Sequence, residues 1–370
     1  MGSALRRLVW LSIVLAASAC AARAQAPLRV AIVGLEHGHV AGFLPQLPLH
    51  PDVTLVGISD PDRALREKYA AQFHLDTKLF YPSEEAMIDA VHPQALLVYT
   101  SPAKHLPIIE IAGKHHLPVM VEKPLTISLR DALAIRRIAE DDHIPVLVNY
   151  ETTWYASNTY AYNALQSGKL GPMRKLVVED GHDGPQEIGV QPEFLKWLTD
   201  PGQNGTGALY DFGCYGVDLA TWLMHGATPL TVTAVTQQIK PYVYPHVDDE
   251  GTIILTYPQG QAIIQGSWNW PFSRKDMQLY GATGYVYTDG GDRVEVRLKG
   301  QRDPQTLTPP PLAPPNDTSL DYLKAVLRGS LKPQGDLTSL DTNVIVMQVL
   351  DAARTSARTG RTIRLTPLPK

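Results

Sequence analysis

The strongest constraint on the fold is a regular alternation of short apolar segments and helical segments over residues 28–148. Short, almost wholly apolar segments are typical of strands that are buried on both faces of a parallel sheet. Helical patterns such as Asp62–Phe73 and Ser128–Asp141 separate them, and Ser128 is expected to cap its helix. We therefore predict a parallel sheet covered by helices on both faces. Its predicted strands are Leu28–Val33, Val53–Ser59, Ala95–Tyr99, Pro118–Val121 and Val146–Asn149.

After residue 150 the apolar residues alternate with period two, which predicts a second α/β domain with a large, mainly antiparallel open sheet. Helices at Trp154–Gln166 and Gly213–Met224 would cover one face of it. The proline-rich segment 308–315 is expected to be an extended connector, followed by helices at Asp317–Arg328 and Thr338–Thr359. The predicted strands are Val177–Glu179, Thr231–Thr236, Thr252–Thr256, Ala262–Ser267 and Met277–Tyr280.

Composition agrees with two globular domains, at 27–149 and 150–370. The chain has 370 residues, of which 44% are hydrophobic and 19% are charged. A net charge of −4 without a basic run disfavours nucleic acid as a partner.

Residues 1–26 resemble a signal peptide for export to the periplasm or beyond. Arg6 and Arg7 precede an apolar region at Leu8–Ala22 that is too short to span a bilayer, and we expect cleavage after Ala24. Lipid attachment at Cys20 is a weaker alternative, and the paired arginines leave secretory and twin-arginine export open. After processing, no transmembrane segment is expected.

The loop after the first strand begins like a dinucleotide-binding turn and then departs from it. Gly34 supplies the first glycine of the G-x-G-x-x-G pattern, but Glu36 and His39 occupy the other two positions. Glu36 would oppose phosphate binding unless its side chain turns away, whereas Gly38 would restore close approach in a longer loop. The loop is therefore a weak signal for a dinucleotide.

Asp60 supports the dinucleotide interpretation, because it ends the second strand 26 residues after Gly34. A carboxylate there accepts hydrogen bonds from the adenosine ribose and repels a 2′-phosphate, so NAD is favoured over NADP. The alternative is that Asp60 is an ordinary turn residue.

Glu36, His37 and His39 could be taken for a metal cluster. Three such residues on one tight loop rarely converge on one ion, so we expect solvated residues of the loop and helix start, and no metal site.

Glu122, Lys123 and Pro124 follow the fourth strand, whose carboxyl end faces the predicted cofactor cleft. Proline restricts the residue before it, so Lys123 is held on a stiff turn. An ammonium group there can hydrogen-bond to a sugar hydroxyl and lower its pKa. Elsewhere, a surface ion pair would be the default interpretation of Glu122 and Lys123.

These motifs resemble those of the glucose–fructose oxidoreductase, inositol 2-dehydrogenase and MocA family. The resemblance covers nearly all of the mature chain, and Glu122-Lys123-Pro124 is its most specific element. The other matching segments are Thr100–His105, Gly168–Gly171, Gly205–Asp218, Val247–Asp249, Ser267–Trp268 and Ser356–Gly360.

The resemblance implies a Rossmann domain, a second domain whose sheet forms an oligomer interface, and hydride transfer between a nicotinamide and a sugar or cyclitol carbon. By matching position, Lys123, Asp211 and Tyr215 would be catalytic. The residues that would line the cofactor are Gly34, Gly38, Asp60, Thr100, Ser101, His105, Glu122 and Lys123.

Tyr215 needs help to act as a base, because a free tyrosine has a pKa of about 10. We expect Lys123 to stabilise its phenolate. The alternative for Tyr215 is a packed aromatic. His182, Trp197, His246 and Trp268 are candidates for sugar contacts, although each has an ordinary packing explanation.

Three hypotheses follow. The first is an exported NAD(P)-dependent sugar oxidoreductase, with NAD favoured. The second is a glycosidase on the same scaffold that oxidises its sugar transiently. The third, motivated by Glu36 and His39, is a sugar-binding relative without catalysis.

Overall fold

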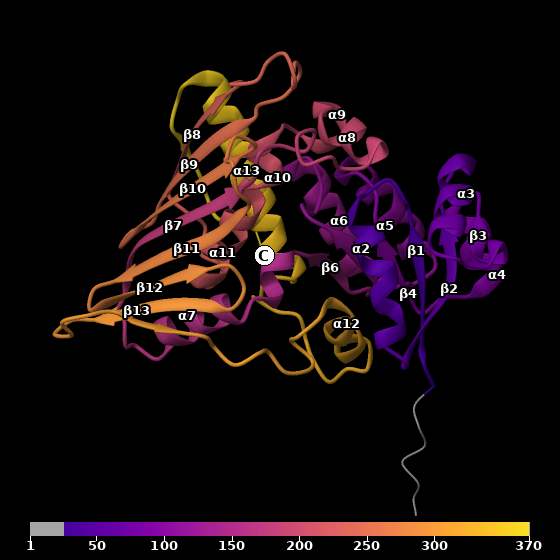
Figure 1. The fold of residues 1–370 in the computed structure, drawn as a ribbon, viewed down its shortest axis with the longest axis horizontal. Helices are drawn as coiled ribbons and strands as arrows, with labels where there is room; N and C mark the ends of the chain where they lie inside the picture. The colour runs from indigo at the N-terminus through magenta and orange to yellow at the C-terminus, as the bar shows by residue number, and fades with distance from the viewer. Residues whose placement is uncertain (1–25, 370) are drawn as a thin grey trace, which may run out of the picture.

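The first of two α/β units is built on a six-stranded sheet. The computed structural model describes residues 26–369, and Figure 1 shows the two units side by side. All strand pairs of the first sheet are parallel, in the order β3-β2-β1-β4-β5-β6, which is the Rossmann arrangement. The predicted fold class is confirmed. The strands are β1 (Leu28–Val33), β2 (Val53–Ser59), β3 (Phe80–Tyr81), β4 (Ala95–Val98), β5 (Val119–Glu122) and β6 (Val146–Asn149).

Local capping fixes where the helices of this unit begin. The Ser128 hydroxyl accepts a hydrogen bond from the Asp131 N–H at 3.1 Å, at the start of the helix 129–141. The Asp62 carboxylate caps the helix 63–72 in the same way, through the Ala64 N–H at 2.8 Å. The predicted cap at Ser128 is thus confirmed. The helices are α2 (His39–Phe43), α3 (Arg63–Gln72), α4 (Glu84–Val91), α5 (His105–Lys114) and α6 (Leu129–Asp141).

The second unit contains a nine-stranded sheet in the order β14-β13-β12-β11-β7-β10-β9-β8-β15. Its strands pair antiparallel except for β7 and β10, as predicted for a mainly antiparallel sheet. The strands are β7 (Met173–Gly181), β8 (Thr231–Gln237), β9 (Glu250–Thr256), β10 (Gln261–Ser267), β11 (Arg274–Gly281), β12 (Gly284–Asp289), β13 (Arg293–Leu298), β14 (Gln305–Leu307) and β15 (Ile363–Arg364).

Helices cover one face of the large sheet (Figure 1). The approach is close enough to require glycine in α11, since a Cβ at Gly216 would lie 2.4 Å from Ile264 Cγ2 of β10. The helices of this layer are α7 (Ala156–Gln166), α10 (Ala208–Asp211), α11 (Gly213–Leu223) and α13 (Leu340–Thr359). Two further short helices, α8 (Pro192–Leu198) and α9 (Pro201–Asn204), lie between the two units.

The chain returns to the first unit near its end. Segment 308–315 contains no helix or strand, as predicted for a connector. It leads into α12 (Ser319–Leu327), whose Leu320 and Leu323 share a core with Val30 of β1. Helix α12 belongs to the segment 150–370 that was predicted as the second domain, but it packs on the first sheet. The predicted domain boundary at residue 150 stays a prediction.

The predicted signal peptide lies outside the described residues except for Ala26. Within residues 26–369, none of the helices combines the length and apolarity needed to span a bilayer.

Candidate active site

A buried ion pair joins the two units. Lys123 stands just after β5, at the carboxyl end of the parallel sheet, and Asp211 ends α10. The Lys123 Nζ lies 2.5 Å from Asp211 Oδ1 and also donates to the Asp211 backbone carbonyl at 3.1 Å. Both residues are almost fully buried, at 5% and 4% exposure. The structure thus brings together the two residues that the sequence placed at the catalytic centre.

The sequence around Asp211 folds so as to hold its carboxylate toward Lys123. The Trp268 indole N–H donates to Asp211 Oδ2 at 3.0 Å. At the start of α10, the Asp248 carboxylate accepts hydrogen bonds from the N–H groups of Gly207 and Leu209. A Cβ at Gly207 would lie only 1.8 Å from the Asp248 carbonyl oxygen, so only glycine allows this approach.

The pair is ionised at neutral pH. Burial opposes ionisation of Asp211, yet the Lys123 ammonium and its hydrogen bond hold the pKa of this carboxyl below its usual value. Burial likewise opposes protonation of Lys123, and Asp211 outweighs that effect and raises the pKa of the amine. Each charge therefore depends on the other.

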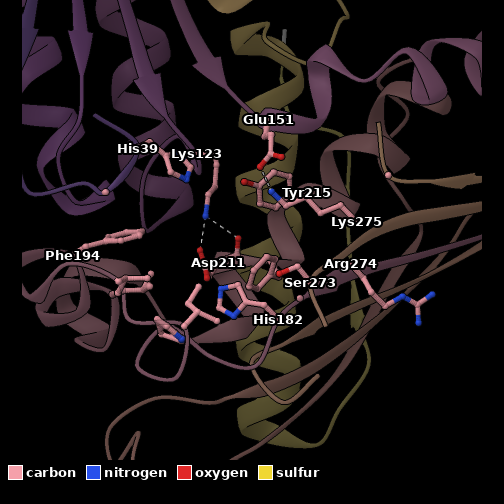
Figure 2. A pocket seen from close by; sticks show the side chains of 18 of the residues that line it. His39, Lys123, Glu151, His182, Phe194, Asp211, Tyr215, Ser273, Arg274 and Lys275 are labelled. Atoms are coloured by element: carbon pink, nitrogen blue, oxygen red, sulfur yellow. Dashed lines mark hydrogen bonds and ion pairs between the residues drawn. The ribbon is translucent and has the colours of Figure 1, made fainter. Parts of the chain in front are cut away.

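The pair faces a cavity of about 520 Å³ between the units (Figure 2). Around it gather charged, polar and aromatic side chains from both units, which suits a polar ligand with several hydroxyl groups. Its walls include Gly38, His39, Glu151, Tyr155, His182, Phe194, Phe212, Tyr215, Arg274 and Lys275.

His182 is the ionisable group in the cavity that sequence reasoning underrated. Its Nδ1 accepts a hydrogen bond from the Gly184 N–H at 2.9 Å, and its ring meets Phe212 edge-on. Burial lowers the pKa of His182, so its ring is neutral at pH 7 beside the ion pair. Glu151 and Lys275, which pair with each other in the same wall, were not predicted. The sequence signal that could have found them is their position, because Glu151 follows β6 and Lys275 lies at the start of β11.

Tyr215 lines the cavity, but Lys123 does not lower the pKa of its phenol in this structure. The Lys123 Nζ lies 5.2 Å from the centroid of the Tyr215 ring, and the Lys275 Nζ lies 4.6 Å from it. The cations therefore approach the ring, and Asp211 already neutralises the lysine. Burial raises the pKa of Tyr215 well above its usual value, so Tyr215 is a neutral phenol.

The loop after β1 shows how the chain accommodates its departures from the glycine pattern. Gly34 has a φ of +86°, and a Cβ there would lie 2.3 Å from Thr100 Cγ2. The Glu36 carboxylate turns to accept hydrogen bonds from the Ser101 N–H at 2.9 Å and from Lys104 Nζ at 2.7 Å. Its charge is thus compensated from within the fold.

His37 corrects the prediction of a solvated loop, because it is fully buried. Its ring centroid lies 4.7 Å from that of Phe194 and 5.2 Å from that of Trp197, both in α8. The Trp197 indole N–H also donates to the Glu36 carbonyl at 3.1 Å. Helix α8 therefore lies directly across the loop.

A second cavity, of about 420 Å³, lies beside the same loop. Gly34, Asp60 and Thr100, three of the predicted cofactor residues, line it. The Asp60 carboxylate is 4% exposed and accepts hydrogen bonds from the N–H groups of Leu35 and Asp62, both at 2.8 Å. It therefore shapes the turn as well as lining the cavity.

The other predicted cofactor residues stand behind these walls. Ser101 is buried and its hydroxyl donates to Gln203 at 2.8 Å, while the His105 Nδ1 meets the Leu125 carbonyl at 3.0 Å. Glu122 is buried and bonded to His39 Nδ1 and Asn149 Nδ2, both at 2.9 Å. Burial opposes its ionisation, yet His39 and Asn149 hold the pKa of Glu122 below its usual value. These contacts fix the turn that carries Lys123.

Comparison with known proteins identifies both units. Residues 28–150 match the model of an oxidoreductase family with an NAD-binding Rossmann fold. Residues 159–287 match the model of the GFO/IDH/MocA C-terminal domain.

Characterised relatives are similar over most of their length. The chain is 26% identical over 314 residues to dTDP-3,4-didehydro-2,6-dideoxy-alpha-D-glucose 3-reductase of Streptomyces antibioticus, covering 82% of this chain and 89% of that protein. It is 23% identical over 335 residues to D-apiose dehydrogenase of Paraburkholderia graminis, covering 85% and 84%.

Solved structures share the fold. Aldose-aldose oxidoreductase from Caulobacter crescentus, complexed with glycerol, superposes with a TM-score of 0.78 at 22% identity. The superposition covers 92% of this chain and 100% of that chain. An inositol dehydrogenase homolog from Azotobacter vinelandii, complexed with NAD+, gives 0.76 at 20% identity, covering 93% and 98%.

Proposed function

The chain belongs to the Gfo/Idh/MocA oxidoreductase family, and on that premise we propose that it transfers hydride between a nicotinamide cofactor and a hydroxyl-bearing carbon of a sugar or cyclitol. The observation that carries this proposal is the ionised Lys123–Asp211 pair, buried at the cavity between the cofactor-binding unit and the second unit. Relatives named as sugar reductases and dehydrogenases support the substrate class.

The residues present fit a dinucleotide lying along the carboxyl edge of the first sheet. The loop after β1 and the residues of α8 contribute to both cavities, so together the cavities border the loop on both sides. Gly34, Asp60, Thr100 and Lys104 would hold the adenosine end, and Gly38, His39 and Lys123 the nicotinamide end. When bound, the nicotinamide supplies the hydride acceptor or donor.

The protein's own groups would orient and protonate the substrate. Lys123 presents its remaining N–H to a substrate oxygen, because two of its protons are already directed at Asp211. Asp211 keeps that amine charged and in place. His182 is better matched than the Tyr215 phenol to take up the hydroxyl proton near neutral pH. Its Nδ1 accepts the Gly184 N–H, so the neutral ring carries its proton on Nε2, and Nδ1 must release that hydrogen bond before it can act as the base. Tyr215 then serves as a hydrogen-bonding wall.

The charges of the second cavity support NAD over NADP. The carboxylates of Glu36, Asp60, Asp62, Glu84 and Glu193 outnumber Lys104 and Lys196 there. A 2′-phosphate would add two negative charges to this acidic surround, so the dinucleotide without it is favoured.

Anaerobic incubation of the purified protein with NAD or NADP and a panel of monosaccharides and inositols tests this function. We expect NAD to bind more tightly and a subset of the sugars to reduce it. Failure to bind either nucleotide would contradict the proposal. Cleavage of a glycoside without net change in nicotinamide would select the glycosidase, and nucleotide and sugar binding without any turnover would select the non-catalytic relative.

We also propose that the protein is exported, on the evidence of residues 1–26 alone. Mass spectrometry of the mature protein from the native cell would test this. A chain beginning at Gln25 is expected, and an intact first residue would contradict the proposal.

A further inference from the structure

Two histidines and a glutamate come together beside the 520 Å³ cavity, and His39 is the one of them that lines it. His37 and His39 lie on the loop after β1, and Glu122 ends β5. One nitrogen or oxygen donor from each lies within 4.8 Å of the others. The sequence alone grouped the two histidines with Glu36, whose carboxylate turns away, and the structure replaces Glu36 by Glu122.

His37 carries the observation that packing does not explain. Its ring is fully buried, and its Nε2 has no hydrogen-bond partner among residues 26–369. Stacking against Phe194 and Trp197 accounts for where the ring lies but gives this nitrogen nothing to bind. A buried polar atom without a partner costs roughly 1–3 kcal/mol, so a water or a ligand at Nε2 is the physical expectation.

We propose that His37, His39 and Glu122 bind one divalent transition-metal ion of the zinc type, with an open coordination position toward the cavity. Two imidazoles and one carboxylate form the ligand set of several catalytic zinc sites. The site needs neither nicotinamide nor sugar to form, and it shares His39 with the proposed nicotinamide end of the cofactor.

The geometry requires only a small adjustment. Ligands at 2.0–2.2 Å from one tetrahedral ion lie about 3.5 Å apart, so donors now within 4.8 Å must close by about 1 Å. His39 Nδ1 and Glu122 are already 2.9 Å apart, and the His39 side chain, 41% exposed, has room to turn. His37 Nδ1 accepts a hydrogen bond from the His39 N–H at 3.2 Å, so the ring proton lies on Nε2. Coordination through Nε2 requires this proton to move to Nδ1 and that hydrogen bond to break.

The Glu122 carboxylate favours a cation at this place, whereas the neighbouring Lys123 ammonium opposes one and is compensated by Asp211. Glu122 is buried, and its hydrogen-bond donors are His39 and Asn149. The nearby Lys123 ammonium is directed at Asp211. Because Gly38 and His39 line the cavity, the open position would accept an oxygen from a ligand bound there, either a sugar hydroxyl or a phosphate oxygen.

Titration of chelator-treated, full-length protein without a histidine tag tests the site, using Zn²⁺ by calorimetry and Co²⁺ by visible absorption. We expect one equivalent of Zn²⁺ per chain. His39→Ala and Glu122→Gln should each weaken binding by at least about 100-fold, the upper end of what loss of a supporting group costs. His115→Ala, at an exposed histidine beyond the end of α5, is the matched control and should leave binding unchanged.

Three results would overturn the proposal. They are absence of stoichiometric binding, binding that survives both variants, and binding that is lost equally in His115→Ala. Circular dichroism of each variant distinguishes loss of the site from loss of fold, and His39→Ala keeps the test usable if Glu122→Gln does not fold.

Glucose and inorganic pyrophosphate, added separately to the Co²⁺ form, test the open position. A spectral change with one of them identifies the oxygen donor, and no change with either would overturn the open position. No nicotinamide is present in these titrations, so their failure is distinguishable from failure of hydride transfer.

Discussion

At the residue scale, the proposed activity depends on two opposite charges that are buried together. Sequence motifs brought Lys123 and Asp211 to attention, and the fold places their atoms 2.5 Å apart. What the sequence could not supply was burial. Burial raises the pKa of Tyr215 instead of lowering it, and α8 covers the His37 ring that was expected to be solvated.

Replacing one member of the pair should cost both turnover and stability. Lys123→Met is expected to lower turnover by at least about 100-fold. It should also destabilise the fold by about 3–5 kcal/mol, because Asp211 is left buried and unpaired. Urea unfolding and steady-state rates measure the two effects.

The double variant Lys123→Met/Asp211→Leu separates these effects. It should recover most of the stability, since no charge remains buried, without recovering turnover. Full turnover in Lys123→Met would contradict the assignment of the site.

Asp180 should make stability depend on pH in an unusual direction. It is buried, and neither carboxylate oxygen has a hydrogen-bond partner in the part of the chain that the structure describes. Burial raises its pKa well above the ordinary 3.8, so the folded state retains a proton that the unfolded state releases. Stability should therefore fall as pH rises from about 4 toward the raised pKa.

Asp180→Asn removes this titration at nearly constant volume. Its melting temperature should exceed that of the wild type at pH 8 and approach it at pH 4, as measured by calorimetry. A difference between the two proteins that is the same at both pH values would show that Asp180 does not titrate as described.

At the element scale, the sequence predicted the positions of most strands and helices in the first unit. It did not predict helix α8. The strands at 28–33, 53–59 and 146–149 were predicted with the bounds that the structure has, because they are apolar on both faces. The hairpins of β12 to β14 were missed, since half-buried polar and tyrosine residues hide their alternation. The packing of α8 on the loop after β1 joins residues far apart in sequence, so no local pattern reports it.

Helix α8 should slow the exchange of a bound dinucleotide. Phe194 contacts His37 and lines the cavity, and a Cβ at Gly38 would lie 2.7 Å from its ring. Phe194→Ala should therefore increase the release rate of NAD several-fold while turnover per bound cofactor changes less. Stopped-flow release measures this, and Phe272→Ala, at an exposed phenylalanine, is the control. Unchanged release would show that α8 does not restrict the cofactor.

At the scale of the whole molecule, the family resemblance predicted the two-unit architecture, and the family matches and the fold confirm it. Periodicity alone could not have placed α12, which packs on the first sheet although residues 150–318 separate it from β6. It also could not have located the cavity, which exists only where the two units meet.

The large sheet leads to a prediction about assembly. On its outer face, Tyr280, Tyr285 and Tyr287 cluster, with the rings of Tyr285 and Tyr287 stacked at 4.3 Å. We expect this face to form a homo-oligomer, because half-buried aromatic residues are enriched in interfaces. Light scattering should show an oligomer that Tyr285→Glu reduces to monomer. A monomeric wild type would contradict this.

The most direct test of the catalytic centre is transfer of deuterium from a substrate sugar labelled at the reacting carbon to bound NAD, followed by mass spectrometry of the extracted nucleotide. The wild type should yield deuterated NADH, and Lys123→Met should bind NAD but yield none above background. Equal labelling in the two proteins, or a wild type that binds NAD and transfers no label from any sugar or inositol, would contradict the account.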